Sequence, residues 1–159
     1  DLEILPDLHP LYQLRGVAQS KMRLILLLLI LTITPQPPGD PYYVAPAGVT
    51  QFQQAVGIGL LAHNTTPEGR AFAELKPGDI VTVTTKGKFQ VVAVERWYIC
   101  TNLYCNAQGE RLTEAELSVR MYGGEYPLVL QTCIEHGGDY SWGRLFILAE
   151  RYKAKTRAD

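Results

Sequence analysis

Two apolar segments near the C-terminal end, separated by a polar loop, constrain the fold most strongly. Residues 128–133 read Leu-Val-Leu-Gln-Thr-Cys, and residues 144–150 read Arg-Leu-Phe-Ile-Leu-Ala-Glu. Short apolar runs bounded by turn residues are typical of buried strands. If these two strands pair as neighbours, the thiol at the end of the first and the guanidinium at the start of the second face the same spot. Several further short strands with turn signals predict an antiparallel barrel or sandwich.

The residues at the ends of these segments suit nucleophilic acyl transfer. That chemistry needs a thiol to attack and a fixed positive donor for the charge that develops on oxygen, the roles of Cys133 and Arg144. His63, at the end of the apolar run 55–62, is the candidate base. His136 is the rival because it follows Cys133 closely, but we expect its glycine-rich loop to be mobile, and a general base should be held still. We therefore prefer His63.

Other properties weigh against this reading or exclude other classes. Taken alone, a cysteine in an apolar strand is usually a small core residue. The net charge is -1 and no Lys/Arg run stands out, so we expect no nucleic-acid partner. A length of 159 residues and an apolar content of 47% predict one folded domain.

The motifs around these residues resemble the sortase family of cysteine transpeptidases. That family has an apolar strand ending in Thr-Cys, an arginine about ten residues later and a catalytic histidine far upstream. The matching residues here are Leu130-Gln131-Thr132-Cys133 and Arg144, and upstream His63, Phe72, Leu75 and Gly78-Asp79-Ile80-Val81. The resemblance covers about residues 42 to 150. One departure is Val129, where the family usually has threonine.

The resemblance implies an all-β fold, a closed barrel of about eight strands with short helices and 3-10 turns. It also implies a transpeptidase in which Cys133 attacks a carbonyl in a sorting motif near the C-terminus of a secreted protein. His63 supports the thiolate and protonates the leaving amine, and Arg144 donates to the substrate carbonyl or the oxyanion. An amine on a cell-wall precursor, a protein lysine or water then resolves the acyl-enzyme.

Further expectations concern the substrate, cofactors and location. Ala62, Thr132 and Trp142 are the candidate substrate contacts, and no cofactor or metal is expected. The protein is expected to act outside the cytoplasm, secreted or anchored to the outer face of the cytoplasmic membrane. An L,D-transpeptidase is rejected because that family places Ser-His-Gly before its cysteine. A non-catalytic secreted binding barrel that keeps the scaffold is the alternative.

The N-terminal part predicts an export or anchoring segment before the domain. Residues 1–21 are an unassigned extension, and residues 22–34 carry a basic flank and an apolar run typical of a signal peptide or membrane anchor. A buried strand is the rival interpretation of that run. A proline-rich linker over 35–41 leads to the catalytic domain at 42–152, and 153–159 is a tail.

The remaining elements follow from local signals. Thr113-Glu114-Ala115-Glu116 is a capping box that predicts a helix over 114–121. Cys100 and Cys105 form a disulfide if the protein is exported, or stay unpaired; the pair is a weak zinc signal. The other expected elements are a helical turn over 49–55, strands over 55–61, 80–84 and 89–98, a helical turn over 72–75, and a loop over 101–112.

Overall fold

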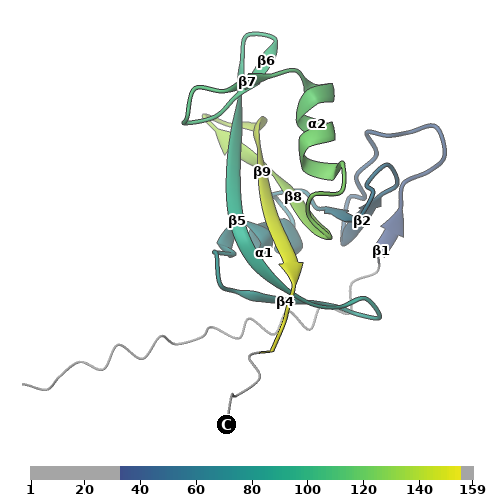
Figure 1. Ribbon diagram of the computed structural model, residues 1–159. Coiled ribbons are helices and arrows are strands. Elements are labelled where there is room, and N and C mark those ends of the chain that lie inside the picture. The colour runs from purple at the N-terminus through teal and green to yellow at the C-terminus, as the bar shows by residue number, and fades with distance from the viewer. Residues whose placement is uncertain (1–32, 155–159) are drawn as a thin grey trace, which may run out of the picture.

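The computed structural model describes residues 33–154, which form one nine-stranded sheet and two α-helices (Figure 1). This confirms the expectation of a mainly β fold. The strands are β1 (Ile33–Pro35), β2 (Val49–Phe52), β3 (Ile58–Leu61), β4 (Ile80–Val83), β5 (Gly87–Cys100), β6 (Leu103–Cys105), β7 (Arg111–Leu112), β8 (Leu128–His136) and β9 (Asp139–Arg151), and the helices are α1 (Pro67–Glu74) and α2 (Glu114–Tyr122).

The strand order is β1-β2-β3-β8-β9-β5-β6-β7, with β4 paired to β5. The β1–β2 and β3–β8 pairs are parallel and the other pairs are antiparallel. Within residues 33–154 this path does not close on itself, so the closed barrel implied by the resemblance is not confirmed. Both helices of this part of the chain are α-helices, and none of its residues is in a 3-10 helix.

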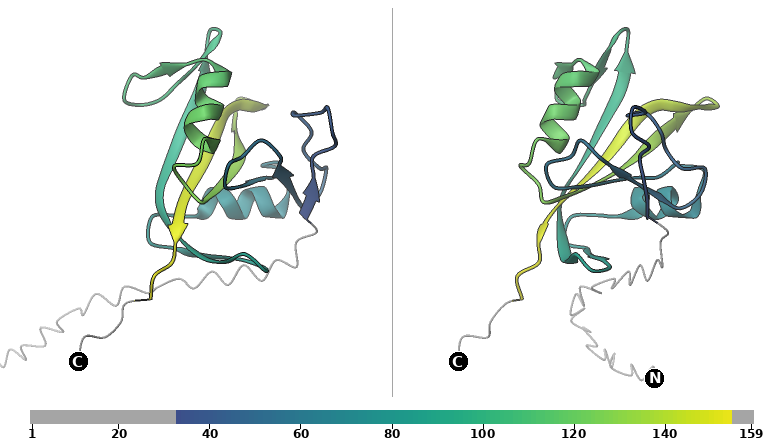
Figure 2. Two further views of the ribbon diagram at one scale, coloured as in Figure 1. Left: turned by 45° about the vertical axis from the view of Figure 1, so that its right-hand side comes forward. Right: turned by 90° about the vertical axis from the view of Figure 1, so that its right-hand side faces the viewer.

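The sheet has an apolar cluster on each face, because side chains alternate along β8 and β9. Leu128 and Leu130 pack in one cluster with Phe72 of α1. Val129 packs in the other with Leu117 of α2. The two helices therefore cover different faces of the sheet, as Figure 2 shows.

The β8–β9 hairpin is longer than the sequence predicts. The expected polar loop over 134–143 is mostly strand, because β8 runs to His136 and β9 begins at Asp139. Gly137 and Gly138 make the turn at φ of 60° and 88°, a conformation that glycine adopts at little cost. The expectation of a mobile loop around His136 is wrong, since His136 pairs with Asp139 in the ladder.

The N-terminal segment differs from the expectations in two places. The helical turn expected over 49–55 is wrong: Val49 and Thr50 are fully buried in β2, where β-branched residues pack well. The sheet also begins before the expected domain start, because β1 pairs with β2 and the adjoining Gln36 is only 5% exposed. Gln36 donates to the carbonyls of Pro41 (2.8 Å) and Tyr43 (3.1 Å), which fixes the proline-rich segment against the sheet.

The apolar run at 24–31 lies outside the described residues, as do residues 1–23. The export, anchor and strand interpretations of that run therefore stay predictions. Neither helix within 33–154 has the length and apolar character that a membrane span requires.

Two segments contain more regular structure than the sequence predicts. The helix α1 begins at Pro67, earlier than the short turn expected over 72–75, because Thr66 caps it by accepting from the Gly69 amide at 3.2 Å. The loop expected over 101–112 contains β6 and β7. Cys100 and Cys105 form a disulfide that joins β5 to β6, which decides between the alternatives for this pair.

The capping box at the start of α2 is present as predicted. The Glu116 amide donates to Thr113 Oγ1 at 3.2 Å, and the Thr113 amide donates to Glu116 Oε2 at 2.8 Å. The Thr113 amide, and also the Thr113 hydroxyl, donate to the Glu116 carboxylate and lower its pKa. Because the folded-state pKa is lowered, the stability from this contact is present above the ordinary pKa of glutamate and is lost as the pH falls through the lowered pKa.

We expect Thr113→Ala to lower the free energy of unfolding by about 1 kcal/mol, since an N-cap bond is lost. Urea unfolding monitored by circular dichroism measures this. The variant Thr113→Ser keeps the cap oxygen and is expected to match the parent. Equal loss in both variants would contradict a capping role.

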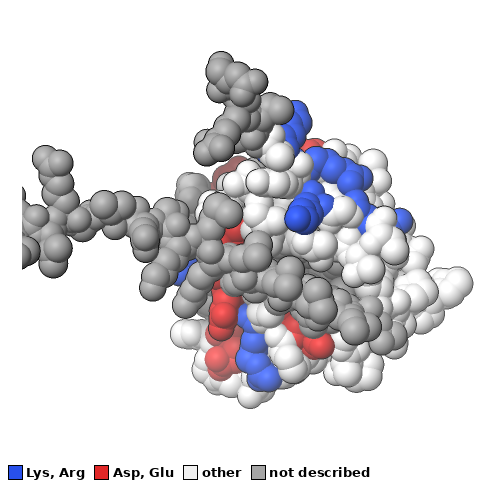
Figure 3. All heavy atoms as spheres, turned by 90° about the horizontal axis from the view of Figure 1, so that it is seen from below, with Lys and Arg blue, Asp and Glu red and all other residues white. Residues whose placement is uncertain are grey.

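Charged side chains are mixed on the face shown in Figure 3. Acidic and basic side chains both occur there, with uncharged residues between them. The mixture agrees with the net charge of -1 for the whole chain.

Candidate active site

A groove of about 740 Å³ lies on the α2 side of the sheet. It is bounded by the segment after β1, the end of β3, the ends of the β8–β9 pair and the first turns of α2. Five of the six predicted site residues are in its lining: Ala62, His63, Thr132, Cys133 and Arg144. The titratable residues that line it are Tyr42, His63, Tyr104, Glu114, Tyr122, Cys133 and Arg144.

Cys133 and Arg144 lie directly opposite each other on β8 and β9. Side chains of directly paired residues share one face of a sheet, and here Arg144 Nη1 lies 3.7 Å from Cys133 Sγ. Cys133 is half-buried, and of the three cysteines it is the free one, because the other two form the disulfide. The sulfur is therefore open to the groove with a positive charge beside it.

The same guanidinium nitrogen is held by the hairpin. Arg144 Nη1 donates to the carbonyl of Ser141 at 3.1 Å and to that of Gly143 at 3.2 Å. The remaining N–H groups of the fork have no further partner among the hydrogen bonds of residues 33–154. They are available to an oxyanion or a carbonyl in the groove.

His63 reaches the groove from the strand beside Cys133. β3 and β8 are parallel with Leu61 opposite Gln131, and the Ala62 amide donates to the Gln131 carbonyl at 3.0 Å. His63 and Cys133 are each two residues beyond that pair, so His63, just after the end of β3, is at the level of Cys133 in β8. His63 Nε2 lies 3.3 Å from the carbonyl oxygen of Val44. A carbonyl only accepts, so this contact requires the proton on Nε2.

The backbone of His63 is fixed by the start of α1. Its carbonyl accepts from the Thr66 amide at 3.0 Å and from Thr66 Oγ1 at 2.8 Å. Gly69 packs directly against this carbonyl, and a Cβ at Gly69 would overlap it and lie 2.8 Å from Thr132 Oγ1. The helix α1 therefore fixes the position of the His63 backbone. It does so through a close contact at Gly69 that only glycine permits.

We expect Gly69→Ala to lower the free energy of unfolding by about 1–3 kcal/mol and to shift His63, because the added methyl overlaps backbone. The loss occurs although alanine is the better helix former. Thermal unfolding measures the stability, and the His63 ring resonances report its environment. Glu74→Ala, at an exposed position of the same helix, is the control and should leave both unchanged. An unshifted His63 in Gly69→Ala would contradict the packing argument.

The three predicted substrate contacts differ in their access to the groove. Ala62 lines the groove, in the position that the sequence predicts. Thr132 borders it, but the residue is only 1% exposed and its hydroxyl points toward Gly69, on the α1 side of the sheet. Its side chain is therefore not presented to a substrate in the groove. Trp142 is not among the lining residues; its ring lies 4.5 Å from that of Tyr98 and 4.5 Å from that of His136.

Tyr104 and Tyr122, which the sequence did not single out, also line the groove, as does Gln131 of the strand motif. The Tyr122 hydroxyl donates to Gln131 Oε1 at 2.7 Å, two residues before Cys133 on the same face. Burial raises the pKa of Tyr122, so this donor stays protonated. Tyrosine is frequent in this chain, and no local motif marks these two. Their role follows from pairing between distant strands and α2.

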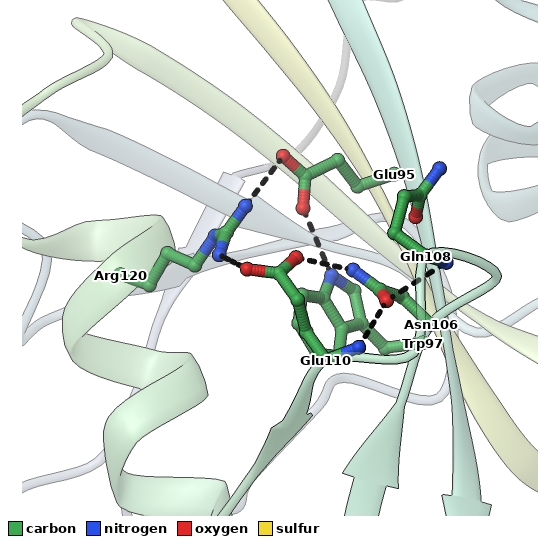
Figure 4. A network of polar contacts seen from close by, with 6 residues as sticks. All are labelled: Glu95, Trp97, Asn106, Gln108, Glu110 and Arg120. Carbon is green, nitrogen blue, oxygen red and sulfur yellow. Dashed lines mark hydrogen bonds and ion pairs between the residues drawn. The ribbon is translucent and has the colours of Figure 1, made fainter.

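A network of polar contacts fastens α2 to the sheet beside the groove (Figure 4). Arg120 of α2 pairs with Glu95 of β5 at 3.5 Å and with Glu110 at 2.9 Å. Glu95 accepts from Trp97 Nε1 at 2.9 Å, and Glu110 accepts from Asn106 Nδ2 at 2.6 Å. The turn that follows β6 is thus tied to both α2 and β5.

Among residues 33–154, no group of three or more His, Cys, Asp or Glu side chains is arranged to hold a metal ion.

Comparisons with known proteins add a distant likeness to a solved structure. No family model and no curated protein match the chain. A solved structure, the complex of Streptococcus agalactiae sortase C1 and MTSET, is similar over 70% of this chain with 20% identity and a TM-score of 0.39. The chain spans 58% of the length of that sortase chain. A likeness at this level assigns no activity to the groove.

Proposed function

We propose that this protein is a cysteine transpeptidase of the sortase type that acts through an acyl-enzyme on Cys133. The observation that carries the proposal is the 3.7 Å approach of Arg144 Nη1 to Cys133 Sγ. It occurs in a groove that His63 also lines, at the same level of the neighbouring strand. Thiol, guanidinium and imidazole then have the three roles that acyl transfer from a peptide requires.

In the first step the Cys133 thiolate attacks the carbonyl carbon of a peptide bond. The negative charge that develops on the carbonyl oxygen accepts hydrogen bonds from Arg144. The carbon–nitrogen bond then breaks, and the leaving amine takes a proton from the His63 imidazolium. The product is a thioester between Cys133 and the N-terminal part of the substrate.

In the second step an amine attacks the thioester carbonyl. Neutral His63 takes the proton that the amine loses, and the carbon–sulfur bond breaks to return the Cys133 thiolate. Water in place of the amine gives hydrolysis with the same proton balance. The amine belongs to a cell-wall precursor or a protein lysine, and the substrate is a secreted protein with a sorting motif. With such a substrate, the protein would act outside the cytoplasm, which is part of the proposal.

The proposal is tested with a pool of peptides that vary at every position, mixed with an amine acceptor. Mass spectrometry is expected to find a peptide joined to the acceptor with loss of its C-terminal part. A peptide that is bound but neither cleaved nor joined would support a non-catalytic binding protein and overturn the proposal.

The two histidines near Cys133 are distinguished by mutation. We expect His63→Gln to lower the rate of acyl-enzyme formation by about 10²–10⁴-fold, the usual contribution of a general acid or base. His136→Gln changes a ring that stacks on Trp142 and is expected to stay within a few-fold of the parent. Rates come from quenched-flow mass spectrometry. The reverse order of the two effects would transfer the role to His136.

A further inference from the structure

We infer that Tyr104 is a positioning residue for the proposed reaction: the face of its ring holds the Arg144 guanidinium against the Cys133 thiol. The inference rests on the proposed function and adds a residue to its machinery. Tyr104 does not act on the substrate bond itself; it acts through the orientation of Arg144.

The Tyr104 ring contacts the guanidinium. Arg144 Cζ lies 5.8 Å from the centre of the Tyr104 ring, within the range of a cation–π contact. Nη1 also donates to the carbonyls of Ser141 and Gly143. The guanidinium is thus held both by its own hairpin and by the ring, with Nη1 3.7 Å from the sulfur.

A competing partner for the guanidinium lines the same groove. Glu114, in the first turn of α2, is the acidic residue among those that line it. A carboxylate that lines the same groove attracts the guanidinium. The Tyr104 ring opposes that rotation, because turning away from the sulfur also means leaving the ring.

Tyr104 itself is held firmly. It is 8% exposed and packs with Trp97, Leu117 and Phe146 in the α2-side cluster. It lies between the residues of a short disulfide hairpin, since Cys105 follows it and is bonded to Cys100. The polar network of Figure 4 fixes the turn that comes next in the chain. Because the backbone around Tyr104 is constrained on both sides, its ring is suited to position a flexible side chain.

The electrostatics of the phenol agree with a neutral ring. Burial raises the pKa of Tyr104, Arg144 opposes this, and Glu114 and Cys133 add to it. The phenol therefore stays protonated at neutral pH, and the ring presents an uncharged, electron-rich face to the guanidinium.

The test measures alkylation of Cys133 by iodoacetamide at neutral pH and at alkaline pH, where every accessible thiol is a thiolate. The ratio of the two rates reports how strongly the site favours the thiolate, independently of access. We expect Tyr104→Leu to lower this ratio about tenfold, as loss of a desolvated cation–π contact implies. Tyr104→Phe keeps the ring face and is expected to retain the parent ratio.

A packing control separates positioning from general loosening. Met121→Ala removes a buried side chain from the same cluster without touching the groove, and it is expected to lower stability but not the ratio. An unchanged ratio in Tyr104→Leu, or an equal drop in Met121→Ala, would overturn the inference. If the parent protein gives the same rate ratio as a free cysteine peptide, the proposed function fails. If the parent and Tyr104→Leu both give a higher ratio than that peptide, and the two ratios are equal, only the role of Tyr104 fails.

Discussion

Cys133→Ala is expected to abolish the acyl-enzyme, with peptide cleavage falling by more than about 10⁴-fold, because no other group in the groove can form the thioester. Intact-mass spectrometry after mixing with a reactive peptide measures the adduct. The chain has three cysteines and two of them form the disulfide, so any thiol adduct in the folded parent maps to Cys133.

The same variant is expected to fold normally. Cys133 is half-buried at the groove and is outside both apolar clusters, so removal of its sulfur leaves no core cavity. We expect the free energy of unfolding to change by less than about 1 kcal/mol. An adduct of equal yield in folded Cys133→Ala would show that another residue is the nucleophile.

Arg144→Ala is expected to lower kcat by about 10²–10³-fold, the usual cost of one preorganised donor to an oxyanion. Two effects combine: the thiolate loses its neighbouring positive charge, and the developing oxyanion loses its donors. Arg144→Lys keeps the charge but not the planar fork, so we expect it to recover only part of the rate. Steady-state kinetics with a cleaved peptide measure both variants.

Arg151 is the matched control on the same strand. Its Nη1 donates to the Lys86 carbonyl at 2.7 Å and its Cζ lies 4.9 Å from the Phe89 ring centre, contacts of the same kinds as those of Arg144. It is at the opposite end of β9 from the groove, so Arg151→Ala is expected to leave kcat unchanged. Equal losses in the two alanine variants would mean that Arg144 acts through strand stability.

The central strand pair and its chemistry could be predicted from the sequence. Both segments are short, apolar and bounded by turn residues, and a hairpin is the simplest way to pair two strands that are close in the chain. A hairpin brings Cys133 and Arg144 to the same point, and in the structure the two residues are directly opposite each other on β8 and β9. The capping box of α2 could also be predicted, because its sequence signal is confined to four residues.

Features that depend on distant pairing could not be predicted. The segment 49–52 carries too few residues to show an alternation, and it becomes a strand because β1 and β3 pair on both of its edges. The α1-side orientation of Thr132 follows from the register of β8. The contact of Tyr104 with Arg144 needs the β5–β6 hairpin and the disulfide, which spacing alone left open.

The most direct test of the central claim is the intact mass of the parent protein after brief mixing with the peptide pool, followed by peptide mapping and hydroxylamine. The account predicts an adduct of the N-terminal part of a peptide on Cys133, which hydroxylamine removes because it is a thioester. A peptide that is cleaved while Cys133 stays unmodified and can be replaced by alanine without loss would contradict it.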